Sequence, residues 1–170
     1  MDRVRCATCG EEHDLRDVEP SYNRPDAYFQ VPPAERAQRA SFGTDEGRIR
    51  DASDIERRHF LRALLPIRVR GDTEVCWGIW VEVGGWAWTR ARELWNEPDQ
   101  AGEPPFEGVL ANSLKGYAGT LGLPGRVQLT GPTSAPQFVL DEGLDHPLAR
   151  EQREGVFLER ALEWVAAHVH

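Results

Sequence analysis

Two neighbouring stretches in the middle of the chain alternate between apolar and polar residues, and they constrain the fold more than any other feature. From 59 to 69, the odd-numbered positions carry His, Leu, Ala, Leu, Ile and Val, whereas arginines recur at even-numbered positions. From 75 to 83, the odd-numbered positions carry Val, Trp, Ile, Val and Val. A period of two is typical of strands that bury one face in a core. Gly71 and Asp72 lie between the stretches, so we predict an antiparallel hairpin.

Single residues refine this hairpin. Pro66 lacks the N–H that a strand ladder uses, so the first strand is expected to lie at an edge or to carry a bulge. Trp77 and Trp80 fall on opposite faces of the second strand, and core packing is predicted for both. Trp80 is expected to line a pocket or to lie under the helix predicted over 86–96.

Further elements surround the hairpin. Apolar residues at helical spacing predict helices over 86–96 and about 155–169, and a short helix over 34–40 can open at Pro32 and Pro33. The segment 20–34 is expected to be an irregular surface segment, and 41–54 is expected to be mostly loop. Shorter strands are predicted near Ile49 and over 107–111, 126–130 and 137–140. The set predicts an α+β fold with an antiparallel sheet flanked by helices. We expect one domain, 1–170, in which 1–19 is a metal knuckle and 20–170 is the α+β body.

Composition excludes several classes of protein. The chain has 170 residues, of which 40% are hydrophobic, and it contains no run of about 20 apolar residues that could span a bilayer. Its start lacks the apolar region of a secretory signal. Three cysteines argue against a disulfide framework. We therefore expect a cytoplasmic protein with no membrane partner.

Charge is distributed unevenly along the chain. Residues 1–70 carry 13 Arg and 13 acids, which leaves 7 of the 20 Lys and Arg, and 15 of the 28 acids, for residues 71–170. The formal net charge of −8 therefore belongs to the second part. Nucleic-acid binders usually show a basic surface, so we expect no nucleic-acid partner, although arginines of the first part could form a local patch.

The start of the chain carries the clearest chemical motif. Cys6 and Cys9 are two residues apart, Gly10 follows, and His13 lies close by. Two thiolates at this spacing fit the turn that wraps a zinc ion, and Cys6, Cys9 and His13 are the predicted metal ligands. A closed structural site needs a fourth ligand, whereas a catalytic site keeps that position open. Other interpretations are two idle thiols or a redox pair. Candidates for the fourth ligand are Cys76, His59, Asp45 and a water molecule.

The acidic cluster from Asp141 to His146 has two interpretations. A carboxylate beside a histidine can orient a general base. Alternatively, Asp145 or His146 caps a helix that has Pro147 in its first turn, and this is the prediction that we adopt. The glycine-rich loop 115–120 lacks the order of residues of a phosphate-binding P-loop and is predicted to be a structural turn.

Several segments occur in the order found in one bacterial family. They are Cys6-x-x-Cys9-Gly10-x-x-His13, the strands from His59 through Trp77-Gly78-Ile79-Trp80-Val81, the loop Leu114-Lys115-Gly116-Tyr117 with Thr120, and Asp145-His146-Pro147-Leu148-Ala149 with Gln152 and Gly155. With these segments the chain resembles the family known as domain of unknown function 2199. The resemblance implies a single-domain bacterial protein and no established activity. It also implies a further cysteine after the first helix, and residues 44–48 contain none.

Two functions follow from these observations. The first is a non-enzymatic cytoplasmic module that binds another protein and is held at its N-terminal end by a structural zinc ion. Its acidic second part would steer a basic partner toward it. The second is a metal-dependent hydrolase with an open site at Cys6, Cys9 and His13.

Overall fold

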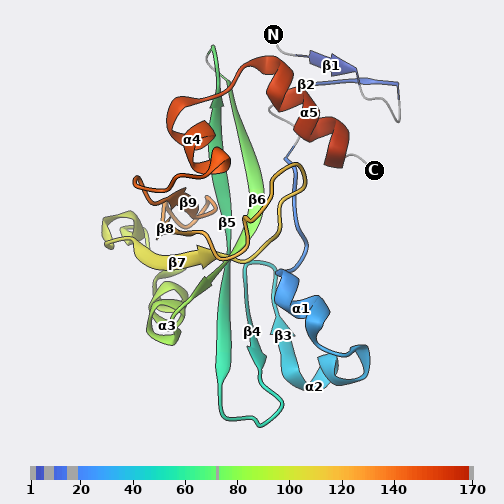
Figure 1. Ribbon diagram of the computed structural model, residues 1–170. Helices are drawn as coiled ribbons and strands as arrows, with labels where there is room; N and C mark the ends of the chain where they lie inside the picture. The colour runs from blue at the N-terminus through green and yellow to red at the C-terminus, as the bar shows by residue number, and fades with distance from the viewer. Residues whose placement is uncertain (1–2, 6–9, 15–18, 72, 169–170) are drawn as a thin grey trace.

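The computed structural model describes residues 3–5, 10–14, 19–71 and 73–168 (Figure 1). Its strands are β1 (Arg3–Arg5), β2 (Glu12–Asp14), β3 (Ala40–Phe42), β4 (Glu46–Arg50), β5 (Arg57–Val69), β6 (Thr73–Val83), β7 (Phe106–Leu110), β8 (Pro124–Gln128) and β9 (Gln137–Leu140). Its α-helices are α1 (Asp26–Gln30), α2 (Arg36–Arg39), α3 (Gly85–Leu94), α4 (Pro147–Glu154) and α5 (Leu158–His168). The α+β prediction is confirmed. None of the described helices is both long and apolar enough to cross a membrane.

The main sheet closes on itself, which corrects the prediction of a purely antiparallel sheet. Seven strands pair in the order β3 to β9, and every neighbouring pair is antiparallel. An additional parallel contact joins β9 to β5 at Leu64 and Gln137, so β5 to β9 form a closed five-stranded barrel. Strands β3 and β4 extend the sheet beyond the barrel. The hairpin of β1 and β2 is a separate two-stranded sheet, and the predicted knuckle residues Cys6 and Cys9 lie outside the described residues.

The predicted hairpin of β5 and β6 is confirmed, and its backbone explains Pro66. The amides of Arg62 and Leu64 donate to Asp45 O and Pro136 O at 2.8 Å each, on the side of β5 away from β6. Because N–H directions alternate along a strand, Pro66 faces that same side. Among the described residues, Gln152 of α4 lies there and donates through Nε2 to Pro66 O at 3.4 Å. Pro66 thus occupies a part of β5 that behaves as an edge, as predicted.

Two apolar clusters lie on the two sides of the sheet. The larger one fills the barrel and contains the odd-numbered residues of β5 and β6, with contributions from α3, α4 and α5. Trp77 belongs to this cluster, where its ring lies 5.6 Å from that of Trp164. Trp80 belongs to the second cluster, so the two tryptophans face opposite ways as predicted.

Residues 20–34 cover the second cluster, which corrects the prediction of an irregular surface segment. Ala27 and Val31 pack with Ile49, Phe60 and Trp80. This segment, and not α3, therefore covers Trp80. In Figure 1, α1 and α2 lie beside β3, and α3 lies on the other side of β5.

A buried asparagine ties this cover to the barrel. Asn112 accepts the amide of Trp80 at 2.8 Å and donates to Arg24 O at 3.0 Å. Its side chain is 0% exposed, so both backbone groups depend on it for a partner. The amide groups of Asn112 therefore fix the position of the segment that leads into α1.

The narrow barrel requires glycine at two facing positions. Gly108 of β7 is directly opposite Gly125 of β8. A Cβ atom on Gly108 would lie 2.6 Å from Val81 Cγ1, and one on Gly125 would lie 2.4 Å from Val139 O. Real Cβ atoms do not approach other atoms so closely, so the strands can coil this tightly only without side chains at both positions.

The cap predicted for α4 is confirmed. His146 Nδ1 accepts the amide of Leu148 at 3.1 Å, and Pro147 occupies the first turn. His146 Nε2 also lies 2.7 Å from Ala118 O, so this ring joins the helix start to the glycine-rich loop. The role of His146 is thus positional, and α5 follows α4 as a separate helix.

Candidate anion-binding site

The predicted metal ligands are only partly placed. Cys6 and Cys9 lie outside the described residues, so the zinc site stays a prediction. His13 is half-buried in β2, opposite Val4 of β1. Within the described parts of the chain, no group of three or more His, Cys, Asp or Glu side chains is arranged to hold a metal ion.

Two candidates for a fourth ligand lie far from each other. Cys76 lies on β6 opposite Pro66 of β5, and His59 lies on β5 opposite Val83 of β6. Positions 76 and 83 are seven residues apart, which is about 23 Å along a strand, so Cys76 and His59 cannot bind one ion. Burial and the neighbouring Glu74 carboxylate raise the pKa of Cys76 to about 12. In the absence of a metal ion its thiol therefore stays protonated at neutral pH, which makes it a poor nucleophile.

Strand β4 presents two different faces because its residues alternate. Gly47 and Ile49 are buried on one side, and Ile49 belongs to the cluster under α1. Arg48 and Arg50 lie on the other side, where Arg48 is exposed and Arg50 is half-buried. The extension of the sheet beyond the barrel thus has one apolar, covered face and one basic face.

Neighbouring strands add to the basic face in register. Ser41 of β3 is directly opposite Arg48, which is directly opposite His59 of β5. Arg50 is directly opposite Arg57. Residues directly opposite each other project on the same side of a sheet. We call this surface, together with the adjoining arginine of α2, the arginine face; it consists of Arg39, Ser41, Arg48, Arg50, Arg57 and His59.

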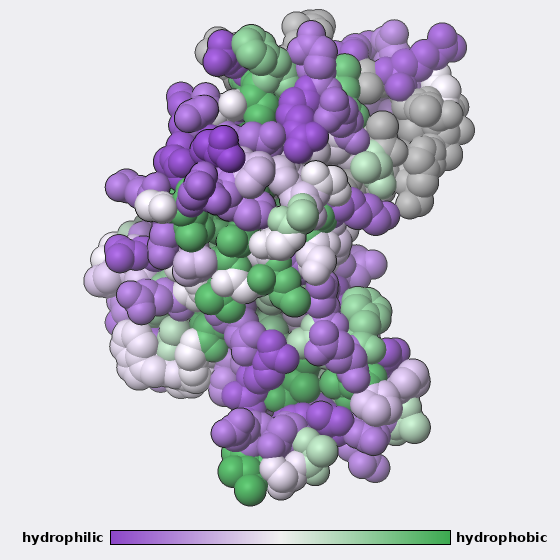
Figure 2. Space-filling model, viewed as in Figure 1, coloured by the Kyte–Doolittle hydropathy of each residue, from purple (hydrophilic) through white to green (hydrophobic). Residues whose placement is uncertain are grey.

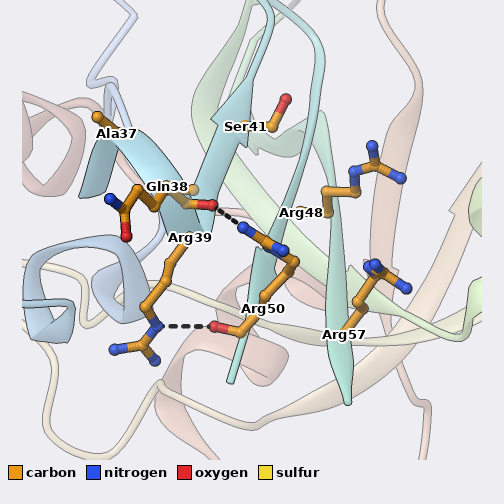
Figure 3. Close-up of a pocket in the computed structure, with 8 residues that line it drawn as sticks. Ala37, Gln38, Arg39, Ser41, Arg48, Arg50 and Arg57 are labelled. Atoms are coloured by element: carbon orange, nitrogen blue, oxygen red, sulfur yellow. Dashed lines mark hydrogen bonds between the residues drawn. The ribbon is translucent and has the colours of Figure 1, made fainter. Parts of the chain in front are cut away.

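Two of these arginines form a fixed wall. The arginines of the face and Ser41 line a cavity of about 310 Å³ (Figure 3). Arg39 donates through Nε to Arg50 O at 3.0 Å and pairs with Glu35 at 2.7 Å. Arg50 donates to Gln38 O and pairs with Asp54 at 2.9 Å. Arg39 and Arg50 are therefore held by the chain and each has a carboxylate partner.

The other two arginines have little negative charge near them. Figure 3 shows Arg48 and Arg57 extending from neighbouring strands toward the same side. Arg48 makes no ion pair with any carboxylate in the described part of the chain; its Cζ lies 5.8 Å from the centre of the Trp88 ring. Arg57 lies 3.7 Å from the Asp54 carboxylate that Arg50 already binds. The face thus carries an excess of positive charge.

Burial and the positive charge of the arginine face lower the pKa of His59. Its ring lies 5.0 Å from that of Trp88 of α3. Burial lowers the pKa of His59, and the charges of Arg48 and Arg57 lower it further, against an opposing effect of Glu82. His59 is therefore neutral at neutral pH, and it can donate or accept one hydrogen bond beside the arginines.

The arrangement is costly for folding. Like charges directly opposite each other on paired strands destabilise a sheet, by roughly 0.2–1 kcal/mol. Asp54 relieves the repulsion between Arg50 and Arg57, and it does so at a φ of +60°, the one positive φ of a non-glycine residue in the described segments. Aspartate tolerates this conformation in turns, so the cost of the face lies in its repelling charges.

Sequence reasoning missed this site although a signal was present. The order Gly47-Arg48-Ile49-Arg50 alternates as strictly as the strands that were predicted. The short strand predicted near Ile49 is confirmed as β4, but the pairing that brings Arg57 opposite Arg50 is a property of the fold.

A family model matches residues 5–156, and its description is an uncharacterised protein conserved in bacteria, DUF2199. The chain belongs to this family. The match takes in both predicted cysteine ligands and the whole arginine face, and it ends before α5. No curated protein and no solved structure matches the chain. For this DUF2199 member, function must therefore be argued from the site itself.

Proposed function

We propose that this family member is a non-catalytic binding module whose contact surface is the arginine face and whose partner is an acidic segment of another protein. The observation that carries the proposal is the pair Arg48 and Arg57. Their guanidinium groups come from paired strands, and among the described residues only one carboxylate, that of Asp54 at 3.7 Å from Arg57, pairs with either of them. Carboxylates bind guanidinium groups through two parallel hydrogen bonds, which adds geometric specificity to the charge.

The surroundings favour a protein partner over a nucleic acid. The chain has a formal charge of −8, and acids such as Asp51, Glu56 and Glu82 lie close to the arginine face in sequence or in register. A long polyanion would extend beyond the face and meet this negative charge. Figure 2 shows hydrophilic residues over most of the visible face of the described chain, with apolar residues in small groups. A short acidic segment fits such a localised positive surface.

We also propose a structural zinc ion bound by Cys6, Cys9 and His13. The β1–β2 hairpin has three residues in each strand and does not join the main sheet. An isolated two-stranded hairpin is marginally stable in water, and a metal ion bound next to it would stabilise it. The hydrolase alternative depends on the same three residues and stays a prediction. The acidic second part of the chain, with a basic partner, is likewise untested.

Site-specific photo-crosslinking tests the binding proposal. A photoreactive residue replaces Ser41 on the arginine face in one chain and Glu107, exposed on β7, in another. Both chains are produced in the native bacterium, and crosslinked peptides are identified by mass spectrometry. We expect position 41 to capture acidic peptides of one protein, and position 107 not to capture them.

Charge variants decide what the crosslink means. The double variant Arg48→Gln/Arg57→Gln should abolish the crosslink from position 41. Arg58→Gln is the matched control, because Arg58 follows Arg57 but projects to the opposite side and pairs with Glu82 at 2.8 and 2.6 Å. The proposal is wrong if position 41 captures nothing beyond position 107, or if the double variant crosslinks as well as Arg58→Gln does.

A further inference from the structure

The donors of the arginine face converge from three adjacent strands. Ser41, Arg48 and His59 form one row across β3, β4 and β5, and Arg50 and Arg57 form the next row. Paired strands lie about 4.8 Å apart, and the Ser41 hydroxyl and the arginine side chains line one cavity, with His59 of β5 next to Arg48. Such a set can donate hydrogen bonds to one group from several directions at once.

Neutralising the excess positive charge of this face takes a ligand with more than one negative charge. Glu35 neutralises Arg39, and Asp54 neutralises Arg50. Arg48 and Arg57 together then carry two positive charges, with only the more distant contact of Arg57 to Asp54 against them. A carboxylate supplies one negative charge, whereas a phosphate monoester supplies about 1.5 to 2 at neutral pH and has three acceptor oxygens.

The face is also prepared for a compact anion. Arg50 and Arg39 are held by backbone carbonyl groups and by their own carboxylates. Arg48 is braced by the Trp88 ring, which also has Arg92 Cζ 4.5 Å from its centre. Guanidinium groups that are already oriented lose less conformational entropy when an anion binds.

From these observations we infer that Arg48 and Arg57 clamp a phosphate monoester dianion, with Ser41 as an additional donor, and that the acidic partner segment carries this group as a phosphorylated side chain. The inference deepens the proposed function, because it assigns a chemical group to the same face. It does not need the zinc site.

A titration followed by nuclear magnetic resonance tests the inference. The full ¹⁵N-labelled chain is titrated at about pH 7.5, where a phosphate ester is mostly a dianion. Four probes are used at constant ionic strength: inorganic phosphate, a glutamate-rich peptide with one phosphoserine, the same peptide with serine, and the same peptide with aspartate. We expect saturable shifts for inorganic phosphate and for the phosphopeptide, confined to 37–41, 48–50 and 57–59.

Variants and a second readout make the outcome decisive. Arg48→Gln should weaken phosphopeptide binding about tenfold or more, Arg48→Lys should weaken it less, and Arg58→Gln should leave it within about twofold. Binding should also raise the pKa of His59 in a histidine titration, because the anion offsets the field of Arg48 and Arg57. Urea unfolding of each variant establishes that it is folded.

The possible failures are distinguishable. Equal binding of the aspartate and phosphoserine peptides would overturn the phosphate inference and leave the acidic-segment proposal intact. Shifts that Arg58→Gln reduces as much as Arg48→Gln, or no saturable shift with inorganic phosphate or the phosphopeptide, would also overturn it. If position 41 captures no partner either, the proposed function fails as well.

Discussion

Removing one charge from the arginine face should make the protein more stable. Arg57 lies directly opposite Arg50, and both project on the side where Arg48 also lies. In Arg57→Gln the side chain keeps nearly its length but loses its charge, and Asp54 remains wholly available to Arg50. A binding surface built from repelling charges predicts this gain, whereas a purely structural ion network predicts a loss.

The magnitude follows from the two contacts of Arg57. Like charges directly opposite cost about 0.2–1 kcal/mol. The attraction lost is the 3.7 Å contact with Asp54, whose side chain is 60% exposed, and such exposed pairs contribute little. We therefore expect the free energy of unfolding to rise by about 0.5 kcal/mol, which corresponds to about 1–2 °C in melting temperature for a chain of this size.

Urea unfolding at low salt measures this difference without adding ions. In 1 M salt, where the Debye length is about 3 Å, the gain should fall to less than about half. Arg58→Gln supplies a control of opposite sign, because it removes the bidentate pair with Glu82 and should lower stability by up to about 1 kcal/mol. A loss of stability in Arg57→Gln comparable to that in Arg58→Gln, or a gain that salt does not reduce, would refute the reasoning.

Three further predictions concern other parts of the molecule. Asn112→Ala leaves the Trp80 amide and Arg24 O without their buried partner, so we expect the free energy of unfolding to fall by about 2–3 kcal/mol. The exposed Asn23→Ala is the control and should lower it by less than about 0.5 kcal/mol. A loss below about 1 kcal/mol in Asn112→Ala would contradict the role of Asn112. The pKa of His59 is lower in the folded state than its unfolded value of about 6.5, so the folded state resists protonation. The free energy of unfolding should therefore fall more in wild type than in His59→Gln as the pH falls from about 7 to 5. Parallel curves of stability against pH would contradict this. Elemental analysis should find about one zinc ion per chain in wild type and in Cys76→Ser, and none in Cys9→Ser. Cys9→Ser should also melt at a lower temperature, because the metal stabilises the fold. A folded wild type that holds no zinc after preparation under reducing conditions with zinc supplied would exclude the zinc site.

The strongly periodic parts of the chain were predictable, and the site was not. The alternation over 59–69 and 75–83 fixed the hairpin of β5 and β6, and the cap of α4 followed from His146 and Pro147. Both depend on interactions between residues that are close in the sequence. The pattern of side chains predicts which face of a strand is buried, but it does not predict which strands pair.

The features that sequence reasoning missed all depend on long-range pairing. The barrel closes through Leu64 and Gln137, which are far apart in the chain. Strand β3 pairs with the short strand that was predicted near Ile49, and the cover over Trp80 is held by Asn112 from beyond β7. The arginine face arises only when β4 and β5 pair in the observed register, so the excess of charge at Arg48 and Arg57 became visible with the structure.

A crystal soaked in tungstate tests the arginine face most directly. Tungstate is a tetrahedral dianion like phosphate, and its anomalous scattering locates it independently of refinement. In crystals whose arginine face opens to solvent, we predict an anomalous peak within hydrogen-bond distance of the Arg48 and Arg57 guanidinium groups, and its loss in Arg48→Gln. Strong peaks elsewhere with none between Arg48 and Arg57 would contradict the assignment of this face as an anion-binding surface.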